Sequence, residues 1–257
     1  MSPACGGGQG GGMEERMRIS ACGRSDIGLR RSNNEDAWLA DTESGLFLVA
    51  DGMGGAAAGE VASDLFARTA ARVVVSGPHR SEALAVACLR RVFTEARQAI
   101  LRHVAQHPAH AAMGCTAELL LLHRSGFVLG HVGDSRTYLL RGGRLRLLTR
   151  DHTLVQQEVD QGIVSPAEAR HHLMRNVLLR AVTANGPANE DIIRGQCMAA
   201  DLFLLCSDGF SDMVDDARIL ELLVRPAPLA EKAARCIDAA RRAGGGDNIT
   251  VVLVAVE

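Results

Sequence analysis

Two long amphipathic stretches, set between groups of short apolar runs, limit what this chain can fold into. Gly59–Val75 and Glu82–His107 repeat apolar residues at helical spacing, whereas the short runs have the length of strands and adjoin one another in sequence. Adjoining strands favour antiparallel sheets, and amphipathic helices need an apolar sheet face to cover. The pattern predicts two helical layers around two packed sheets.

The remaining elements follow from length, periodicity and turn residues. Strands are predicted at Arg18–Cys22, Ala37–Ala40, Leu46–Ala50, Ala117–Leu122, Gly126–His131, Thr137–Arg141, Arg144–Leu148, Ile192–Cys197, Leu202–Cys206 and Ile249–Val254. Shorter helices are predicted at Thr153–Gly162, from a capped start at Ser165, at Asp216–Leu223 and at Ala227–Ala243. Gly142-Gly143 is typical of a hairpin turn. Trp38 and Tyr138, each the only residue of its kind, are expected in the core.

Composition indicates one domain behind a short tail. Residues 1–16 include GGGQGGG and are predicted to be a disordered Gly-rich tail, and residues 17–257 contain no linker or repeat. No apolar run approaches the roughly 18 residues of a membrane span, and a formal net charge of -2 disfavours nucleic-acid or anionic-membrane binding. Seven scattered cysteines are typical of reduced thiols. We expect a cytoplasmic monomer that binds neither nucleic acid nor membrane.

Aspartates stand at the ends of the apolar runs, mostly beside a glycine. Asp51 follows LFLVA, Asp134 follows FVLGHVG, Asp208 follows LFLLCS, Asp247 precedes ITVVLV, and Asp36 lies in NNED. One Asp-Gly pair usually marks only a turn, but several at comparable strand ends can converge on one site. Clustered carboxylates repel or take up protons unless a cation joins them, and oxygen ligands favour Mg²⁺ or Mn²⁺. Zinc fits less well, because HExxH and Cys/His sets at ligand spacing are missing.

Several strings, in order from residue 25 to residue 252, carry a family resemblance: SDIGLRRSNNEDA, VADGMGG, MGCT, GHVGDSR, LTRDHTLVQQ, RNVLLRAV, LLCSDGFSD and GGGDNITVV. They resemble the type-2C metal-dependent Ser/Thr protein phosphatases (PPM family) in their compact bacterial form. The resemblance implies an α+β fold, a four-layer α-β-β-α sandwich of two antiparallel sheets flanked by helices. It also implies a two-metal site between the sheets and a mobile, substrate-gating flap at about residues 150–176.

The resemblance assigns the first metal and the reaction. Asp51 matches the carboxylate that bridges the two metals, and Gly52 matches the residue that offers a backbone carbonyl. Asp208 and Asp247 match the ligands that complete the first metal. The implied reaction is hydrolysis of phosphoserine and phosphothreonine by a hydroxide that bridges two Mn²⁺ or Mg²⁺ ions, without a phosphoenzyme. Asp51 and Asp208 are therefore the candidate catalytic carboxylates.

The second metal, a third metal and the phosphate clamp are implied in the same way. Glu35 and Asp36 match ligands of the second metal, directly or through water. Asp134 matches the ligand of a third, weaker metal in bacterial members. Arg31 matches the catalytic arginine that clamps the substrate phosphate, a task suited to its bidentate fork. The neighbouring Arg30 is the other candidate, and the GLRR spacing favours Arg31.

Some positions depart from the family pattern. Met53 stands where animal members often have a histidine thought to protonate the leaving alkoxide, so water or a metal-bound group must act as the acid. Cys115 replaces the Thr of MGTT, one small residue for another. Leu173 replaces a Pro in the flap, which makes substrate preference the least transferable feature. His152 is expected to fix the base of the flap rather than to act as an acid or base.

The sequence also leaves alternatives to a protein phosphatase that uses metal ions. The same metal site could hydrolyse small phosphoesters or nucleotides, and a non-catalytic relative would only bind phosphoproteins, although this chain has lost no metal aspartate. Cys236 and Arg242 have the Cys-x5-Arg spacing of thiol phosphatases, but IDAAR between them lacks phosphate-cradling glycines and reads as a helix. The expected partners are phosphorylated proteins, including a bacterial Ser/Thr kinase and its targets.

Overall fold

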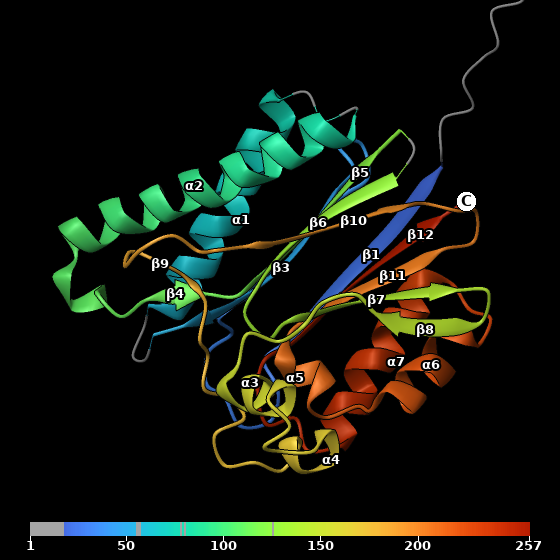
Figure 1. Ribbon diagram of the computed structural model, residues 1–257. Coiled ribbons are helices and arrows are strands. Elements are labelled where there is room, and N and C mark those ends of the chain that lie inside the picture. Colours follow the sequence, from blue (N-terminus) through green and yellow to red (C-terminus); the bar gives the residue numbers. More distant parts are fainter. Residues whose placement is uncertain (1–17, 55–57, 78, 80, 125) are drawn as a thin grey trace, which may run out of the picture.

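Two antiparallel sheets lie face to face between two layers of helices (Figure 1). The computed structural model describes residues 18–54, 58–77, 79, 81–124 and 126–257. The tail predicted at residues 1–16 lies outside the described residues. The α+β, four-layer α-β-β-α architecture predicted from the sequence is confirmed.

The first sheet has the strand order β1-β12-β11-β7-β8. Its strands are β1 Ile19–Asp26, β12 Ile249–Val256, β11 Leu202–Cys206, β7 Arg136–Arg141 and β8 Arg144–Leu147. The second sheet has the order β10-β6-β5-β3-β4-β9, and β2 pairs with β3 beside this path. Its strands are β10 Asp191–Gln196, β6 Gly126–Val132, β5 Ala117–His123, β3 Leu46–Met53, β4 Gly114–Cys115, β9 Val182–Thr183 and β2 Asp36–Asp41.

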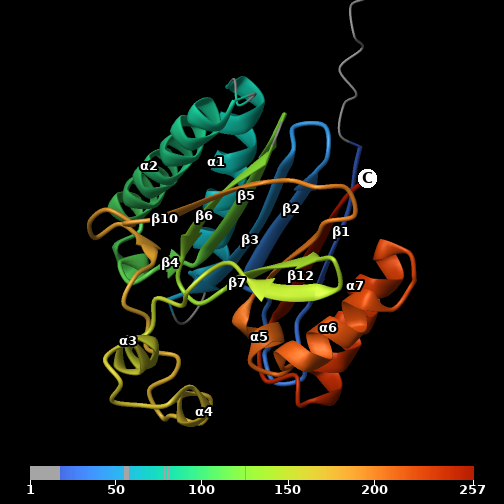
Figure 2. The ribbon, with the colours of Figure 1, turned by 45° about the vertical axis from the view of Figure 1, so that its right-hand side comes forward.

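Helices cover the outer face of each sheet (Figures 1 and 2). The helices over the second sheet are α1 Gly59–Ser76 and α2 Glu82–Gln106, followed by the 3-10 turn η1 Pro108–His110. The helices at the first sheet are α5 Asp208–Ser211, α6 Asp216–Val224 and α7 Leu229–Arg242. Two further helices, α3 Leu154–Asp160 and α4 Pro166–Ala169, project away from the sheets in Figure 2.

Three apolar clusters hold the four layers together. One joins α1 and α2 to the second sheet, one joins α6 and α7 to the first sheet, and one fills the space between the sheets. The strand β3 shows how one run serves two clusters. Leu46 and Leu48 face the helices, while Phe47 and Val49 face the other sheet. Because both faces of β3 are covered, LFLVA is apolar throughout instead of alternating with polar residues.

The structure corrects the predicted elements in a few places. β3 continues to Met53, so Asp51 lies within the strand and not after it. The short strands β4 and β9 and the helix α5 are additional to the prediction. Tyr138 is buried as expected, but Trp38 is 38% exposed. Its ring lies over Gly23 of β1, where a β-carbon would collide with it, so Trp38 covers a strand at the edge of the core.

The segment predicted to be a flap contains α3 and α4. Thr153 caps α3, and Ser165 forms a full capping box with Glu168 at the start of α4. The predicted turn at Gly142-Gly143 has positive φ at both residues, which fits a two-residue hairpin between β7 and β8. Among the described residues, the helices are all too short or too polar to cross a membrane.

Candidate active site

Two strands of the second sheet place two carboxylates directly opposite each other. Asp36 of β2 and Asp51 of β3 are partners in the antiparallel register. Like charges at directly opposite positions destabilise a sheet. The backbone here is fixed from the other side as well, because the Asp51 amide donates to Thr116 Oγ1 (3.0 Å) and the Thr116 amide donates to the Asp51 carbonyl (2.9 Å). The two carboxylates are thus held together by the fold despite their mutual repulsion.

Asp208 reaches the same place from the first sheet. It is the first residue of α5, directly after β11, and its carboxylate is hydrogen-bonded to Asp51. Gly209 is required beside it, because a β-carbon there would collide with the carbonyl oxygen of Asn248. The hydroxyl of Ser207, directly before Asp208, donates a hydrogen bond to Asp36 Oδ2 (2.9 Å). Three predicted ligands, one from each of β2, β3 and α5, are therefore together.

The protonation of these carboxylates reflects their crowding. Burial raises the pKa of Asp36 to about 6. Burial, followed by the charges of Asp212 and Asp247, raises the pKa of Asp208 to about 7. Burial and the neighbouring carboxylates raise the pKa of Asp51 well above its ordinary value. A hydrogen bond between two carboxyl groups needs a proton, so Asp51 and Asp208 share one in this arrangement.

The donor set fits a hard divalent cation. Oδ1 of Asp36 and Oδ1 of Asp208 are buried and have no hydrogen-bond partner among the described residues. Buried oxygens without partners are costly, and a cation would satisfy them and replace the shared proton. All the donors are oxygens, which favours Mg²⁺ or Mn²⁺ over zinc. In this arrangement the described His, Cys, Asp and Glu side chains form no group of three with the spacing of a metal centre.

An N-terminal loop closes over the carboxylates, and Asn248 holds it. Asn248 Oδ1 accepts from the Glu35 amide (2.8 Å), while Nδ2 donates to the carbonyls of Ile27 (3.0 Å) and Asn33 (2.8 Å). Glu35 itself turns toward the start of α1, where its carboxylate lies against Gly59. Burial and the charge of Glu60 raise the Glu35 pKa.

Arg31 lies on this loop, and its guanidinium contacts the carboxylate of Asp247. Its Nη2 donates to Asp247 Oδ2 over 2.6 Å, and its side chain is 49% exposed. The guanidinium can therefore hold a carboxylate on one side and still meet a ligand from solvent. Arg30 is exposed and makes no ion pair with a described residue. Of the two candidates, the geometry favours Arg31.

Asp134 stands in a second group of charges that the sequence reasoning partly missed. Burial, then the charges of Asp208, Asp151 and Asp212, raise its pKa well above the ordinary value. Asp212 follows Asp208 by one helical turn and pairs with Arg175 (3.5 Å), a residue of the predicted flap. The i, i+4 spacing in SDGFSD was the signal that would have indicated Asp212.

His152 ties the base of the predicted flap to the strand end before Asp134. Its amide donates to the Gly133 carbonyl (2.7 Å), and its Nδ1 accepts from the Gly133 amide (3.1 Å). Its carbonyl accepts from the Leu179 amide (2.8 Å). Burial lowers the pKa of His152, which keeps the ring neutral and able to accept. The expected structural role agrees with these contacts.

Burial excludes the alternative in which Cys236 is the nucleophile of a thiol phosphatase. Cys236 is fully buried within α7, and burial raises its pKa to about 12. A thiol with that pKa is not a nucleophile near neutral pH. The described cysteines are all free, which agrees with reduced thiols.

Known proteins share this sequence and fold. Residues 22–244 match the family described as protein phosphatase 2C. The serine/threonine protein phosphatase PstP of Mycobacterium tuberculosis is 42% identical over 233 residues, which are 91% of this chain and 44% of PstP. This chain therefore spans less than half the length of PstP. The serine/threonine phosphatase stp of Listeria monocytogenes is 36% identical over 239 residues, 90% of this chain and 93% of stp.

The likeness extends to three dimensions. The solved structure of the catalytic domain of PstP, in complex with two manganese ions, has a TM-score of 0.83 to this chain at 40% identity. The match covers 93% of this chain and 99% of that one. Sequence and fold agree, and this chain belongs to the protein phosphatase 2C family.

Proposed function

We propose that this chain hydrolyses phosphoserine and phosphothreonine in protein substrates with the help of Mn²⁺ or Mg²⁺. The observation that carries the proposal is the cross-strand pair of Asp36 and Asp51, joined by Asp208 from the other sheet. A fold that forces these carboxylates together is less stable unless cations bind to them. The named functions of PstP and stp and the manganese in the PstP structure support the same reading.

In this proposal Asp51 would hold both ions and Gly52 would offer its carbonyl oxygen. Asp208 and Asp247 would be the other ligands of the first ion. A β-carbon at Gly52 would collide with the Gly59 carbonyl, so only glycine allows the close approach of β3 and α1 there.

The second ion would be held by Asp36 and by Glu35, which lies further out, so it reaches the ion directly or through water. Asp134, whose pKa is raised by burial and then by the charge of Asp208, is the proposed ligand of a third ion.

When bound, the ions supply an activated water and offset the charge on the phosphoryl oxygens. Arg31 binds the phosphoryl group with its planar fork, and Asp247 orients that fork. Thr116 and Asn248 fix the backbone on either side, so the carboxylates need not move when substrate arrives. Met53 has no ionisable group, so water or a metal-bound group would supply the proton for the leaving alkoxide.

A protein substrate fits the surface beside the site better than a nucleotide does. The proposed flap exposes large apolar side chains: Leu173 is 96% exposed, Ile163 66% and Met174 45%. Exposed apolar groups of this size are typical of protein contact surfaces. We propose that the partners are phosphorylated proteins, including a Ser/Thr kinase and its targets. We also propose that this chain acts as a monomer in the cytoplasm.

The test compares a phosphothreonine peptide with a nucleotide monophosphate at equal concentration, with Mn²⁺ and again with EDTA. We expect faster turnover of the peptide, loss of activity in EDTA, and a fall of at least about a hundredfold in Asp51→Asn. Asp64→Asn, an exposed α1 aspartate paired with Arg68, is the matched control and keeps full activity. Faster turnover of the nucleotide would favour the small-phosphoester hydrolase, and EDTA-resistant activity would refute the metal site.

A further inference from the structure

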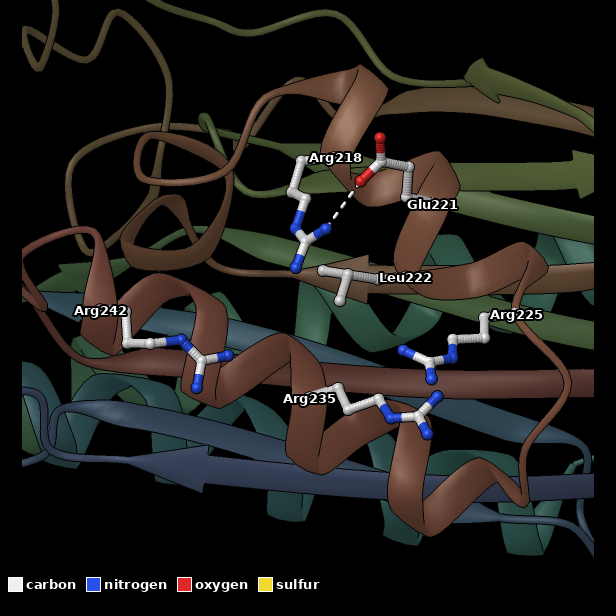
Figure 3. A pocket seen from close by; sticks show the side chains of 6 residues that line it. All are labelled: Arg218, Glu221, Leu222, Arg225, Arg235 and Arg242. Atoms are coloured by element: carbon white, nitrogen blue, oxygen red, sulfur yellow. Dashed lines mark hydrogen bonds and ion pairs between the residues drawn. The ribbon is translucent and has the colours of Figure 1, made fainter.

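A cavity rich in arginine lies between α6 and α7, on the helical layer outside the first sheet (Figure 3). Its volume is about 320 Å³. It is lined by Arg218, Glu221, Leu222, Arg225, Arg235 and Arg242. Four arginines against one glutamate form a cationic site on a chain whose formal net charge is -2. The carboxylates described above belong to other elements, so this is a separate site.

The arginines are only partly neutralised by protein partners. Arg218 pairs with Glu221 at 2.7 Å, and that pair is largely exposed. Arg235 Nη2 pairs with Glu231 (2.5 Å), while Arg235 Nη1 is buried without a hydrogen-bond partner in the described part of the chain. Arg225 and Arg242 form no ion pair with a described residue. A buried donor without a partner is costly, and an anion in the cavity would satisfy it.

Contacts within the protein fix the Arg235 side chain, through Glu231, and the backbone at Arg225. Lys232, the chain's single lysine, donates from Nζ to the carbonyls of Leu223 and of Arg225 (2.7 Å), which anchors the link between the helices. Burial, and next the charge of Arg235, lower the Lys232 pKa. Figure 3 shows the guanidinium ends of Arg225 and Arg235 turned toward each other. Two cations that face each other in a fixed setting are arranged for an anion between them.

The site continues beyond this cavity. A second cavity of about 210 Å³ shares Arg218 and Arg242 with the first and extends to Met213, just after α5. Together the two cavities form a groove along α6 and α7, which we call the arginine groove. Leu222 gives the first cavity an apolar wall. An elongated groove with arginines along it, one aspartate (Asp215) in its second cavity and an apolar wall suits an extended side chain and its backbone better than a free ion.

We propose that the arginine groove binds a phosphorylated segment of a protein partner, with the phosphate between Arg225 and Arg235. A phosphate dianion accepts bidentate hydrogen bonds from guanidinium groups, whereas a single carboxylate offers half the charge. The carbon atoms of the phosphorylated residue lie on Leu222, and the flanking residues follow the groove toward Arg242. This is a docking function, and it goes beyond the proposed hydrolysis because no bond is broken here.

The test uses a peptide with a phosphonate analogue of phosphoserine, which resists hydrolysis, and EDTA-treated protein in a calorimetric titration. We expect Arg225→Ala/Arg235→Ala to bind about tenfold more weakly or worse than wild type. Arg31→Ala keeps the groove affinity, because Arg31 belongs to the other site. The charge-matched Arg90→Ala/Arg102→Ala, on exposed positions of α2, also keeps it.

The outcomes separate the alternatives. Arg225→Ala alone alters an exposed side chain. A threefold or greater loss of peptide affinity in this variant, with an unchanged melting temperature, excludes misfolding as the cause. Equal affinity of the wild type and the double variant overturns the proposal. If wild type binds the unphosphorylated peptide as tightly as the phosphonate peptide, the phosphate assignment is overturned. If it binds polyphosphate more tightly than the phosphonate peptide, the assignment to a protein partner is overturned. Turnover with Mn²⁺ is measured separately, so a failed hydrolysis does not decide the docking result.

Discussion

The crowded carboxylates make a specific prediction about stability and pH in the absence of divalent metal. Asp208 has a pKa of about 7 in the folded chain against an ordinary value of 3.8, so the folded state binds its proton more tightly than the unfolded state does. Stability therefore falls as the pH rises between these two values, because the folded state must give up a proton that the unfolded state has already lost. The contribution is complete at acid pH and is gone above the folded pKa.

The size follows from the same shift. One pKa unit corresponds to about 1.4 kcal/mol, so ionising Asp208 between about pH 5 and about pH 7 costs the folded state up to about 3 kcal/mol. The residue as a whole is only partly buried, so solvent screens its charge and we expect about 1 to 3 kcal/mol. Asp36, with a pKa of about 6, acts in the same direction with a smaller amount over this range.

The assay is urea unfolding followed by circular dichroism in EDTA, for the wild type and Asp208→Asn, at several pH values. The buried histidines are common to both proteins, so their contributions cancel in the difference. We expect the stability of the wild type relative to the variant to fall by about 1 to 3 kcal/mol as the pH rises from about 5 to about 7. A difference that stays flat or grows would refute the account of Asp208.

Three other predictions test the supporting structure. Gly52→Ala sets a β-carbon against the Gly59 carbonyl and is expected to cost at least about 2 kcal/mol in urea unfolding; a neutral result would contradict the close approach. Glu118→Gln removes the charge that His131 pairs with in the core, and we expect a loss of about 3 kcal/mol, whereas a loss under about 1 kcal/mol would exclude a charged pair. Arg31→Lys keeps the charge without the fork, so KM for a phosphopeptide should rise about tenfold with little change in kcat; an unchanged KM would remove Arg31 from substrate binding.

The fold was largely predictable because its elements are regular. The helices at 59–76 and 82–106 show clear periodicity, and strands such as β11 match their predicted bounds. The two-residue strands β4 and β9 were not predictable, since such short pairings form only when their neighbours place them. The partial exposure of Trp38 likewise depends on Gly23, which is remote in sequence.

The site was predictable as a set of residues but not as an arrangement. Strand ends indicated the aspartates, and the family resemblance gave their roles. The register that sets Asp36 opposite Asp51 is a property of strand pairing, which the sequence does not state. The supporting contacts of Asn248 and Thr116 join segments far apart in the chain, so no local pattern marks them. The helical spacing of Asp212 from Asp208 was readable but was overlooked.

The central claim is that divalent cations bind at Asp36, Asp51 and Asp208 and displace the proton that these carboxylates share. The most direct measurement is calorimetric titration of Mn²⁺ into EDTA-treated protein, near neutral pH, in two buffers of different ionisation enthalpy. The account predicts saturable binding of more than one ion per chain with release of protons, and weaker binding with less proton release in Asp51→Asn. Binding without proton release, or the same titration in Asp51→Asn, would contradict it.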